Sequence, residues 1–264
     1  MRNDEAIAPV VAVMLILVVI VTLLSIYNAT YLPGLKQSAE IQHLHDVEEG
    51  ILKFGSDIET AASLKRNDIS FSQQIPLGGG DILLNSLKSG GRLQVQQEDE
   101  PYLTITIAAR PQPIDLFLVN FSYWTVNNFW VDQGYTWQYG YVNITQNPES
   151  GGTWLQHATK DDVNKIVDSF GQTLITITDE GDQTVIEVVN FTADDKRFSS
   201  GNGVGMLKLN AMTDMEGTQY SNTTIDFVIS PNTPLYNNLL GRIENKSVPV
   251  NLSLKFTNIT VGAF

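Results

Sequence analysis

Residues 7–27 read IAPVVAVMLILVVIVTLLSIY, and this stretch decides what kind of protein the chain can be. It carries no charged side chain, and its polar groups are limited to Thr22, Ser25 and the hydroxyl of Tyr27. At about 1.5 Å of rise per residue, a helix of this length covers roughly 30 Å, the thickness of a bilayer's hydrocarbon core. Aliphatic side chains occur on every face, so no polar stripe can turn toward water. We therefore expect this helix to lie in lipid or among other helices.

The remainder of the chain has a different composition. The 264 residues include 16 basic and 29 acidic ones, which gives a net charge of −13. This acidity argues against nucleic acid and anionic membrane surfaces as partners. There is no Cys, so disulfides and thiolate metal sites are excluded. The residues that follow the apolar stretch, about 225 of them, are enough to bury a hydrophobic core.

N-x-S/T sequons are more frequent than chance pairing predicts, and they favour an N-glycosylated surface protein. The candidate acceptors are Asn120, Asn143, Asn190, Asn222, Asn245, Asn251 and Asn258. Asn28 also heads a sequon but is a poorer candidate, because a glycan at the end of the apolar helix would collide with neighbours or lipid. The alternative is that Asn and Thr, both common in β-rich extracellular proteins, fall into this pattern by accident.

The first six residues, MRNDEA, form a short polar leader. A secretory signal has an apolar region of about 7 to 15 residues followed by a small-residue cleavage site. Here the apolar run is longer, and no such site follows it. Arg2 and the amino terminus favour a cytoplasmic N-terminus, which places the polar bulk outside the cell.

NDEA followed by IAPVVAVMLILVVIVTLLSI resembles the N-terminus of archaeal type IV pilins. In that family a charged leader ends in a small residue and precedes a small-residue–Pro–Val step and an unbroken aliphatic helix. The resemblance implies that a prepilin peptidase cleaves between Ala6 and Ile7, so that the apolar helix becomes the mature N-terminus. It also implies that this helix packs against its copies in a filament core. The core residues would then be Ile7, Pro9, Val13, Leu17, Ile20 and Leu24.

A second, amphipathic helix is predicted over residues 35–66. Pro33 and Gly34 precede it and predict a kink or short break over residues 28–34. Its apolar seam recurs at spacings of three and four residues. The seam consists of Ile41, Leu44, Val47, Ile51, Phe54 and Ile58, whereas Glu40, Asp46, Glu48, Lys53 and Glu59 lie off it. We expect the seam to pack on the chain's own β domain, with a coiled-coil dimer as the alternative.

Beyond Asn67 the hydrophobic period changes to two, which predicts strands. Leu93 and Val95 are expected to form a hairpin with residues 103–107, and residues 174–178 a second hairpin with residues 184–191. Further strands are predicted at 206–210 and 223–229. In the last strand the inward pattern slips after Phe256, which predicts a β-bulge near Asn258 that points this sequon outward.

Aromatic residues are dense between residues 117 and 137. They are Phe117, Phe121, Tyr123, Trp124, Phe129, Trp130, Tyr135 and Trp137. Core packing is the commoner cause of such a cluster, while sugar binding or a subunit interface is the alternative.

Catalytic and metal-binding patterns are weak. His43 and His45 lie two residues apart on the predicted second helix and therefore point in different directions. The chain carries no hydrolase, zinc-protease or dinucleotide motif. We expect neither an enzyme nor a cofactor or metal.

These features together predict an α+β protein with four segments. A leader (1–6) precedes a transmembrane or filament-core helix (7–32), an amphipathic helix (35–66) and an extracellular, antiparallel β-sandwich-like domain (67–264). The expected function is that of a structural subunit of an archaeal type IV pilus-like surface filament. Its partners would be its own copies, the membrane before assembly and a prepilin peptidase, but no nucleic acid. The alternative is a membrane-anchored surface glycoprotein or minor pilin that binds a partner or glycan.

Overall fold

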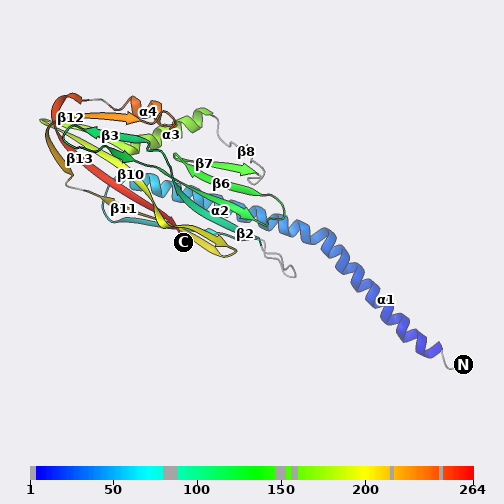
Figure 1. Ribbon diagram of the computed structural model, residues 1–264. Helices are drawn as coiled ribbons and strands as arrows, with labels where there is room; N and C mark the ends of the chain where they lie inside the picture. Colours follow the sequence, from blue (N-terminus) through cyan, green and yellow to red (C-terminus); the bar gives the residue numbers. More distant parts are fainter. Residues whose placement is uncertain (1–3, 80–88, 147–152, 156–159, 215–216, 244–245) are drawn as a thin grey trace.

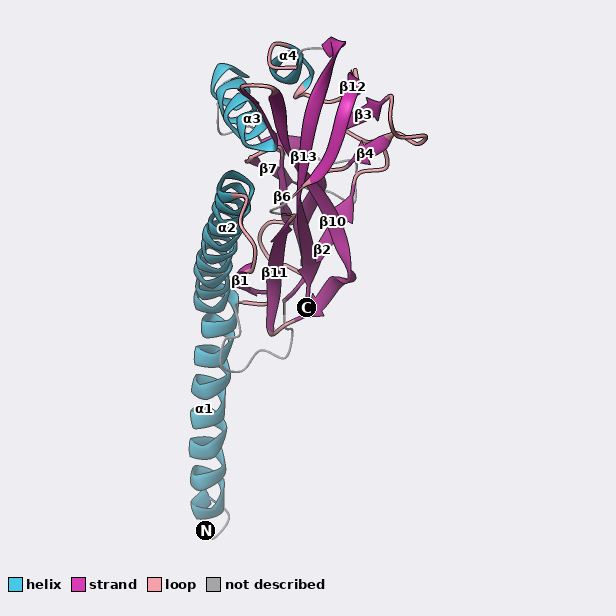
Figure 2. Cartoon of the chain, turned by 90° about the vertical axis from the view of Figure 1, so that its left-hand side faces the viewer, coloured by secondary structure: helices cyan, strands magenta, loops and turns pink. Residues whose placement is uncertain are grey.

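A helical rod and a strand-rich domain make up the molecule (Figure 1). The computed structural model describes residues 4–79, 89–146, 153–155, 160–214, 217–243 and 246–264. The rod consists of α1 (Asp4–Ile26), a π-helical turn η1 (Tyr27–Tyr31) and α2 (Leu32–Leu64). Helix α2 lies along the domain, while α1 extends away from it (Figure 2). The predicted combination of a long apolar helix with a mostly-strand domain is thus confirmed.

The two helices join through a widened turn. The N–H of Leu32 donates to the carbonyl of Tyr27, five residues earlier. Pro33 has no N–H, and its ring would collide with the carbonyl one α-turn before it, so a π turn at this point relieves the clash. The predicted kink at Pro33 and Gly34 is not confirmed, because both residues are helical and the irregular hydrogen bonding lies one turn earlier.

Helix α2 buries one continuous face on the domain. Leu44, Val47, Ile51, Phe54 and Ile58 are buried, and Ala61 and Ala62 extend the seam. The predicted seam is wrong at its first position, because Ile41 is 53% exposed. Glu40, which the pattern placed on the solvated side, is buried instead. The seam repeats as 40, 44, 47, 51, and residue 41 lies about 100° around the helix from residue 40.

Thirteen strands and two further helices occur in the described residues. The helices are α3 (Lys160–Leu174) and α4 (Tyr236–Leu240). The strands are β1 (Ile69–Pro76), β2 (Gly90–Gln97), β3 (Leu103–Ile107), β4 (Ile114–Leu116), β5 (Val119–Val126), β6 (Gln133–Gln138), β7 (Tyr141–Gln146), β8 (Thr153–Leu155), β9 (Ile175–Glu180), β10 (Gln183–Gly201), β11 (Val204–Thr213), β12 (Thr218–Ile229) and β13 (Lys246–Ala263).

The long strand β10 connects two halves of the sheet. Its first part pairs with β9 and β13 in a half that also contains β12, β3, β4, β11 and β1. Its last residues, 198–201, pair with β2 in a half that continues through β5, β6, β7 and β8. The register against β13 shifts between Ala193 and Arg197, so the strand is irregular where it passes from one half to the other.

Two predictions about pairing are wrong. The sheet is not purely antiparallel, because β10 and β13 run parallel. The first predicted hairpin does not form either: β2 pairs with β5 and β10, whereas β3 pairs with β12 and β4. Alternating hydrophobicity identified both strands but carries no information about the partner. The second hairpin is confirmed as β9 and β10, joined by Gly181 and Asp182.

The predicted bulge near Asn258 is also absent. Pairing of β13 with β10 runs in unbroken register from Asn251 to Val261. The buried positions nevertheless change parity, from Leu252 and Leu254 to Ile259 and Val261. Since successive side chains of a strand point to opposite faces, β13 is covered on one face in its first part and on the other face later. The change in the hydrophobic pattern after Phe256 therefore arises because different faces of β13 are buried in its two parts, and not from a bulge.

A string of aromatic rings runs through the core between the rod and the sheet. Successive ring centroids are 5.2 Å apart for Phe54 and Phe121, 5.1 Å for Phe121 and Trp137, and 5.6 Å for Trp137 and Phe170. These rings come from α2, β5, β6 and α3. Aromatic packing thus fixes α2 to the second half of the sheet.

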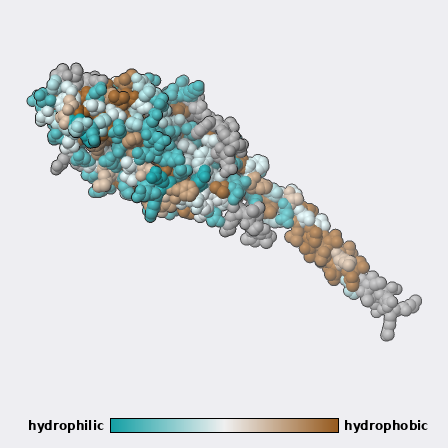
Figure 3. Space-filling view, in the orientation of Figure 1, coloured by the Kyte–Doolittle hydropathy of each residue, from teal (hydrophilic) through white to brown (hydrophobic). Residues whose placement is uncertain are grey.

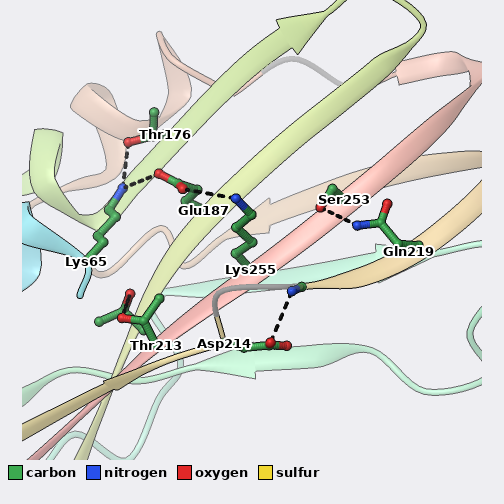
Figure 4. A network of polar contacts seen from close by, with 10 residues as sticks. Lys65, Thr176, Glu187, Thr213, Asp214, Gln219, Ser253 and Lys255 are labelled. Carbon is green, nitrogen blue, oxygen red and sulfur yellow. Dashed lines mark hydrogen bonds and ion pairs between the residues drawn. The ribbon is translucent and has the colours of Figure 1, made fainter. Parts of the chain in front are cut away.

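Polar contacts fix the far end of α2 (Figure 4). Lys65, which follows the helix in a left-handed conformation (φ 46°), donates from Nζ to Thr176 Oγ1 at 2.6 Å. The ammonium also lies 4.0 Å from Glu187, whose other oxygen is 4.0 Å from Lys255 Nζ. Burial lowers the pKa of Lys65, and Glu187 opposes that shift. The rod is therefore held on the sheet by the residue that directly follows its last helical residue, Leu64.

Candidate functional site

Helix α1 is uncovered on every side. Its large apolar side chains from Val10 to Ile26 keep between 47% (Val11) and 63% (Val13) of their surface exposed. Figure 3 shows the resulting apolar segment between the polar domain and the N-terminus. Transferring one such side chain out of water stabilises by about 1.5–3 kcal/mol, so covering the whole helix is worth tens of kcal/mol. By length and composition this helix can cross a membrane.

The residues predicted for a filament core lie along this helix. Val13, Leu17, Ile20 and Leu24 are exposed, as is Pro9. Because the exposed fraction is similar all round α1, the structure singles out no face as the contact surface. Ala6 and Ile7 lie in the helical backbone of α1, and their side chains are outside the described part.

The C-terminal end of α1 and the π turn after it carry side chains that are suited to the edge of a lipid bilayer. The hydroxyl of Thr22 donates to the carbonyl of Val18 at 2.7 Å and so needs no water partner. The rings of Tyr27 and Tyr31 lie 5.5 Å apart in the π turn, where the apolar segment ends. Amphipathic aromatic rings at such a position are typical of a membrane–water interface.

Glu40 clamps the loop of residues 127–132, which joins β5 to β6 and is called the base loop below. Only 4% of Glu40 is exposed, and its two carboxylate oxygens accept the N–H groups of Phe129 (2.6 Å) and Trp130 (2.7 Å). The amide of Asn128 donates to the Val131 carbonyl at 3.1 Å and closes the loop further. Sequence reasoning missed this role: the spacing of residues 40, 44, 47 and 51 places residue 40 on the buried face, but it carries no sign of a contact with a loop about ninety residues later.

The clamped loop presents its two rings to solvent. Phe129 is 52% exposed and Trp130 is 54% exposed, and the ammonium of Lys36 lies 5.3 Å from the centre of the Phe129 ring. The other six aromatic residues between residues 117 and 137 are less exposed. Phe121, Tyr123, Tyr135 and Trp137 are core residues, while Phe117 and Trp124 are half-buried. The core interpretation therefore holds for four of the eight rings and fails for the base loop.

His43 forms a second buried polar contact beside the clamp. Its Nε2 lies 2.9 Å from the hydroxyl of Tyr123, which donates to the Leu77 carbonyl at 3.1 Å. The tyrosine's single proton is thus used, which makes the histidine the donor. Burial lowers the pKa of His43, and the nearby carboxylates of Asp46 and Glu40 partly offset the shift.

Comparison with known proteins adds no assignment. No protein-family model matches the chain, and no curated protein or solved structure is significantly similar to it. The chemistry of the described residues therefore carries the functional argument.

The candidate glycosylation sites differ in accessibility. Asn28, Asn222, Asn251 and Asn258 are exposed, whereas Asn120, Asn143 and Asn190 are half-buried, and Asn245 lies outside the described residues. Asn190 and Asn258 are paired across β10 and β13, and the amide of Asn190 donates to Asn258 Oδ1 at 3.2 Å. These two sequons therefore share one position on the sheet surface.

A small polar cavity of about 80 Å³ lies at the start of β3. Glu98, Glu100, Tyr139 and Asn232 contribute to its lining. Glu98 accepts from Gln138 at 2.9 Å and Glu100 from Asn232 at 3.1 Å, so both carboxylates are engaged in structural hydrogen bonds. Across the described ranges, no three His, Cys, Asp or Glu side chains come together as a metal site.

Proposed function

We propose that the protein is the structural subunit of an archaeal type IV pilus-like surface filament. The observation that carries the proposal is the uncovered apolar helix α1, which continues into a helix packed on a folded domain. A surface of this kind has to be covered, and a helix that is apolar on every side is equally suited to lipid and to a bundle of its own copies.

Two successive environments follow from this chemistry. Before assembly α1 anchors the subunit in the bilayer, with the domain outside the cell. After a prepilin peptidase cuts between Ala6 and Ile7, α1 leaves the lipid and packs with other copies in the filament core. Lipid and neighbouring helices both cover the apolar side chains of α1. In both surroundings its main-chain N–H and C=O groups are bonded to each other within the helix.

The second candidate is a membrane-anchored surface glycoprotein or minor pilin that binds a partner or glycan. The exposed Phe129 and Trp130 favour it, because rigid exposed aromatic rings are typical of binding surfaces. In this case α1 stays in the membrane throughout.

Fractionation of cells that produce the protein distinguishes the filament subunit from the membrane-anchored protein. We expect sheared surface filaments to contain the polypeptide as the main band, with Ile7 as its first residue by mass spectrometry. Substituting Ala6→Trp should block cleavage and leave the precursor in the membrane fraction. If the unmodified protein stays in the membrane with Met1 intact, the filament assignment is wrong and the anchored one stands.

A further inference from the structure

Exposed apolar side chains gather at one end of the β domain. Val126, Phe129, Trp130 and Val204 keep 43%, 52%, 54% and 64% of their surface exposed. Exposed apolar groups scattered singly are ordinary, but a group on neighbouring segments indicates a contact surface.

These side chains belong to strand ends that are joined to each other. Val126, the last residue of β5, pairs with Gly90, and the adjacent Gly91 pairs with Gly201, the last residue of β10. The N–H of Leu77 donates to the Gly203 carbonyl at 2.8 Å, next to Val204. This end of the domain is the one from which α1 emerges (Figure 2).

When α1 spans the membrane, the base loop lies on the side of the domain nearest the bilayer, because it contacts Lys36 and Glu40 near the start of α2. Lys36 follows Tyr27 by nine residues, which corresponds to roughly 14 Å along a helix. Long helical side chains lean toward the N-terminus of their helix, and the Lys36 ammonium lies over Phe129. The headgroup layer extends about 5–7 Å beyond the hydrocarbon core, and a typical helix tilt of about 20° lowers one side of the domain further.

We propose that Phe129 and Trp130 rest in the headgroup layer of the bilayer that holds α1, and so fix the tilt of the domain on the membrane before assembly. The proposal rests on the membrane-anchored stage of the proposed function. Phe and Trp rings partition into this layer without any need for anionic lipid, which suits a chain with a net charge of −13.

The clamp lowers the cost of such an insertion. A main-chain N–H carried into a less polar layer without a partner is destabilising, but both N–H groups at the tip of the base loop are already bound to Glu40. The clamp also holds the two rings outward before any lipid is met, so little conformational entropy is lost on contact.

A lipid surface fits this arrangement better than a neighbouring copy of α1. The exposed groups come from the end of β5, the base loop that follows it and the start of β11, and the ends of β5, β2 and β10 are neighbours in the sheet. A bilayer surface extends across the helix, so it can contact several neighbouring strand ends at once. A neighbouring α1 would instead cover a strip parallel to the helix.

Tryptophan quenching by lipid tests the proposal. The full chain is reconstituted into phosphatidylcholine vesicles whose acyl chains carry bromine either near the headgroups or near the bilayer centre. The emission of Trp130 is obtained as the difference between the unmodified chain and Trp130→Phe. Trp124→Phe is the matched control, since Trp124 lies on the adjoining strand but is half-buried. Vesicle flotation measures insertion of α1 separately.

We expect Trp130 to be quenched by shallow bromine and protected from aqueous iodide, and expect the Trp124 difference signal to respond to neither. If the chain floats with the vesicles but iodide still quenches Trp130, the proposed contact of the base loop with lipid is wrong. The proposed membrane-anchored stage is unaffected by this result. Protection of Trp130 in assembled filaments but not in vesicles also overturns it and assigns the loop to a contact between subunits. A chain that does not float overturns both proposals.

Discussion

Gly55 of α2 lies against Trp137 of β6, and its replacement by Ala tests the packing of the rod on the sheet directly. A Cβ at this position would lie 2.6 Å from Cδ1 of Trp137 and closer still to its Nε1. The indole cannot easily retreat, because it is 2% exposed, stacks on Phe121 and meets Phe170 edge-on. The substitution therefore forces either the helix or the aromatic string to move.

Two opposing effects set the magnitude. Ala is favoured over Gly in a helix by about 1 kcal/mol, whereas overpacking a filled core costs about 1–3 kcal/mol. The neighbour here is a rigid ring held on two sides, so the cost falls at the upper end. We expect Gly55→Ala to destabilise by about 2 kcal/mol, which for a domain of this size lowers Tm by about 4–8 °C.

Thermal unfolding of the full chain in detergent micelles, followed by near-ultraviolet circular dichroism, measures this effect. Gly34→Ala is the matched control: Gly34 is also in α2, but nothing lies within 4 Å of its added Cβ. That variant should be unchanged or more stable by up to about 1 kcal/mol. A Gly55→Ala protein as stable as Gly34→Ala would refute the contact between α2 and Trp137.

Two further predictions concern Glu40 and His43, the buried polar residues in the first half of α2. Replacing Glu40 by Gln leaves one N–H of the base loop facing an amide NH₂, so we expect a loss of about 1–3 kcal/mol in chemical denaturation, against no change for the exposed Glu49→Gln. For His43, burial lowers the folded-state pKa, so the unfolded chain binds a proton more readily below its ordinary pKa of about 6.5. Stability should therefore fall as the pH drops below that value, and His43→Gln should remove this part of the pH dependence while the exposed His45→Gln retains it. Equal pH dependence in all three proteins would show that His43 does not titrate differently on folding.

Local periodicity was sufficient for the two helices of the rod and for seven of the thirteen described strands. The spacing of Leu44, Val47, Ile51, Phe54 and Ile58 identifies the buried face of α2, because a helix repeats every 3.6 residues regardless of its partner. Pairing between strands is not encoded in the same way. The parallel register of β10 with β13 joins residues almost seventy positions apart, and no short-range pattern distinguishes it from an antiparallel pair.

The candidate site likewise has one part that the sequence predicts and one part that it does not. The apolar α1 could be identified from composition alone, since its exposure follows from having no polar face. The role of Glu40 could not, because a carboxylate at a seam position is ordinarily a reason to end the seam. Only the fold brings the main chain of Phe129 and Trp130, about ninety residues later in the sequence, to its two oxygens.

The placement of β13 has a consequence for the order in which the protein becomes folded. Its three neighbours β10, β11 and β12 all precede it in the chain, and it lies between them. Until residues 246–263 emerge, those strands have unpaired edges and the core beneath them stays open. Long-range contacts of this kind form slowly, and exposed strand edges invite association with other chains. Because synthesis proceeds from the N-terminus, the core of the domain is completed only after residues 246–263 have been added.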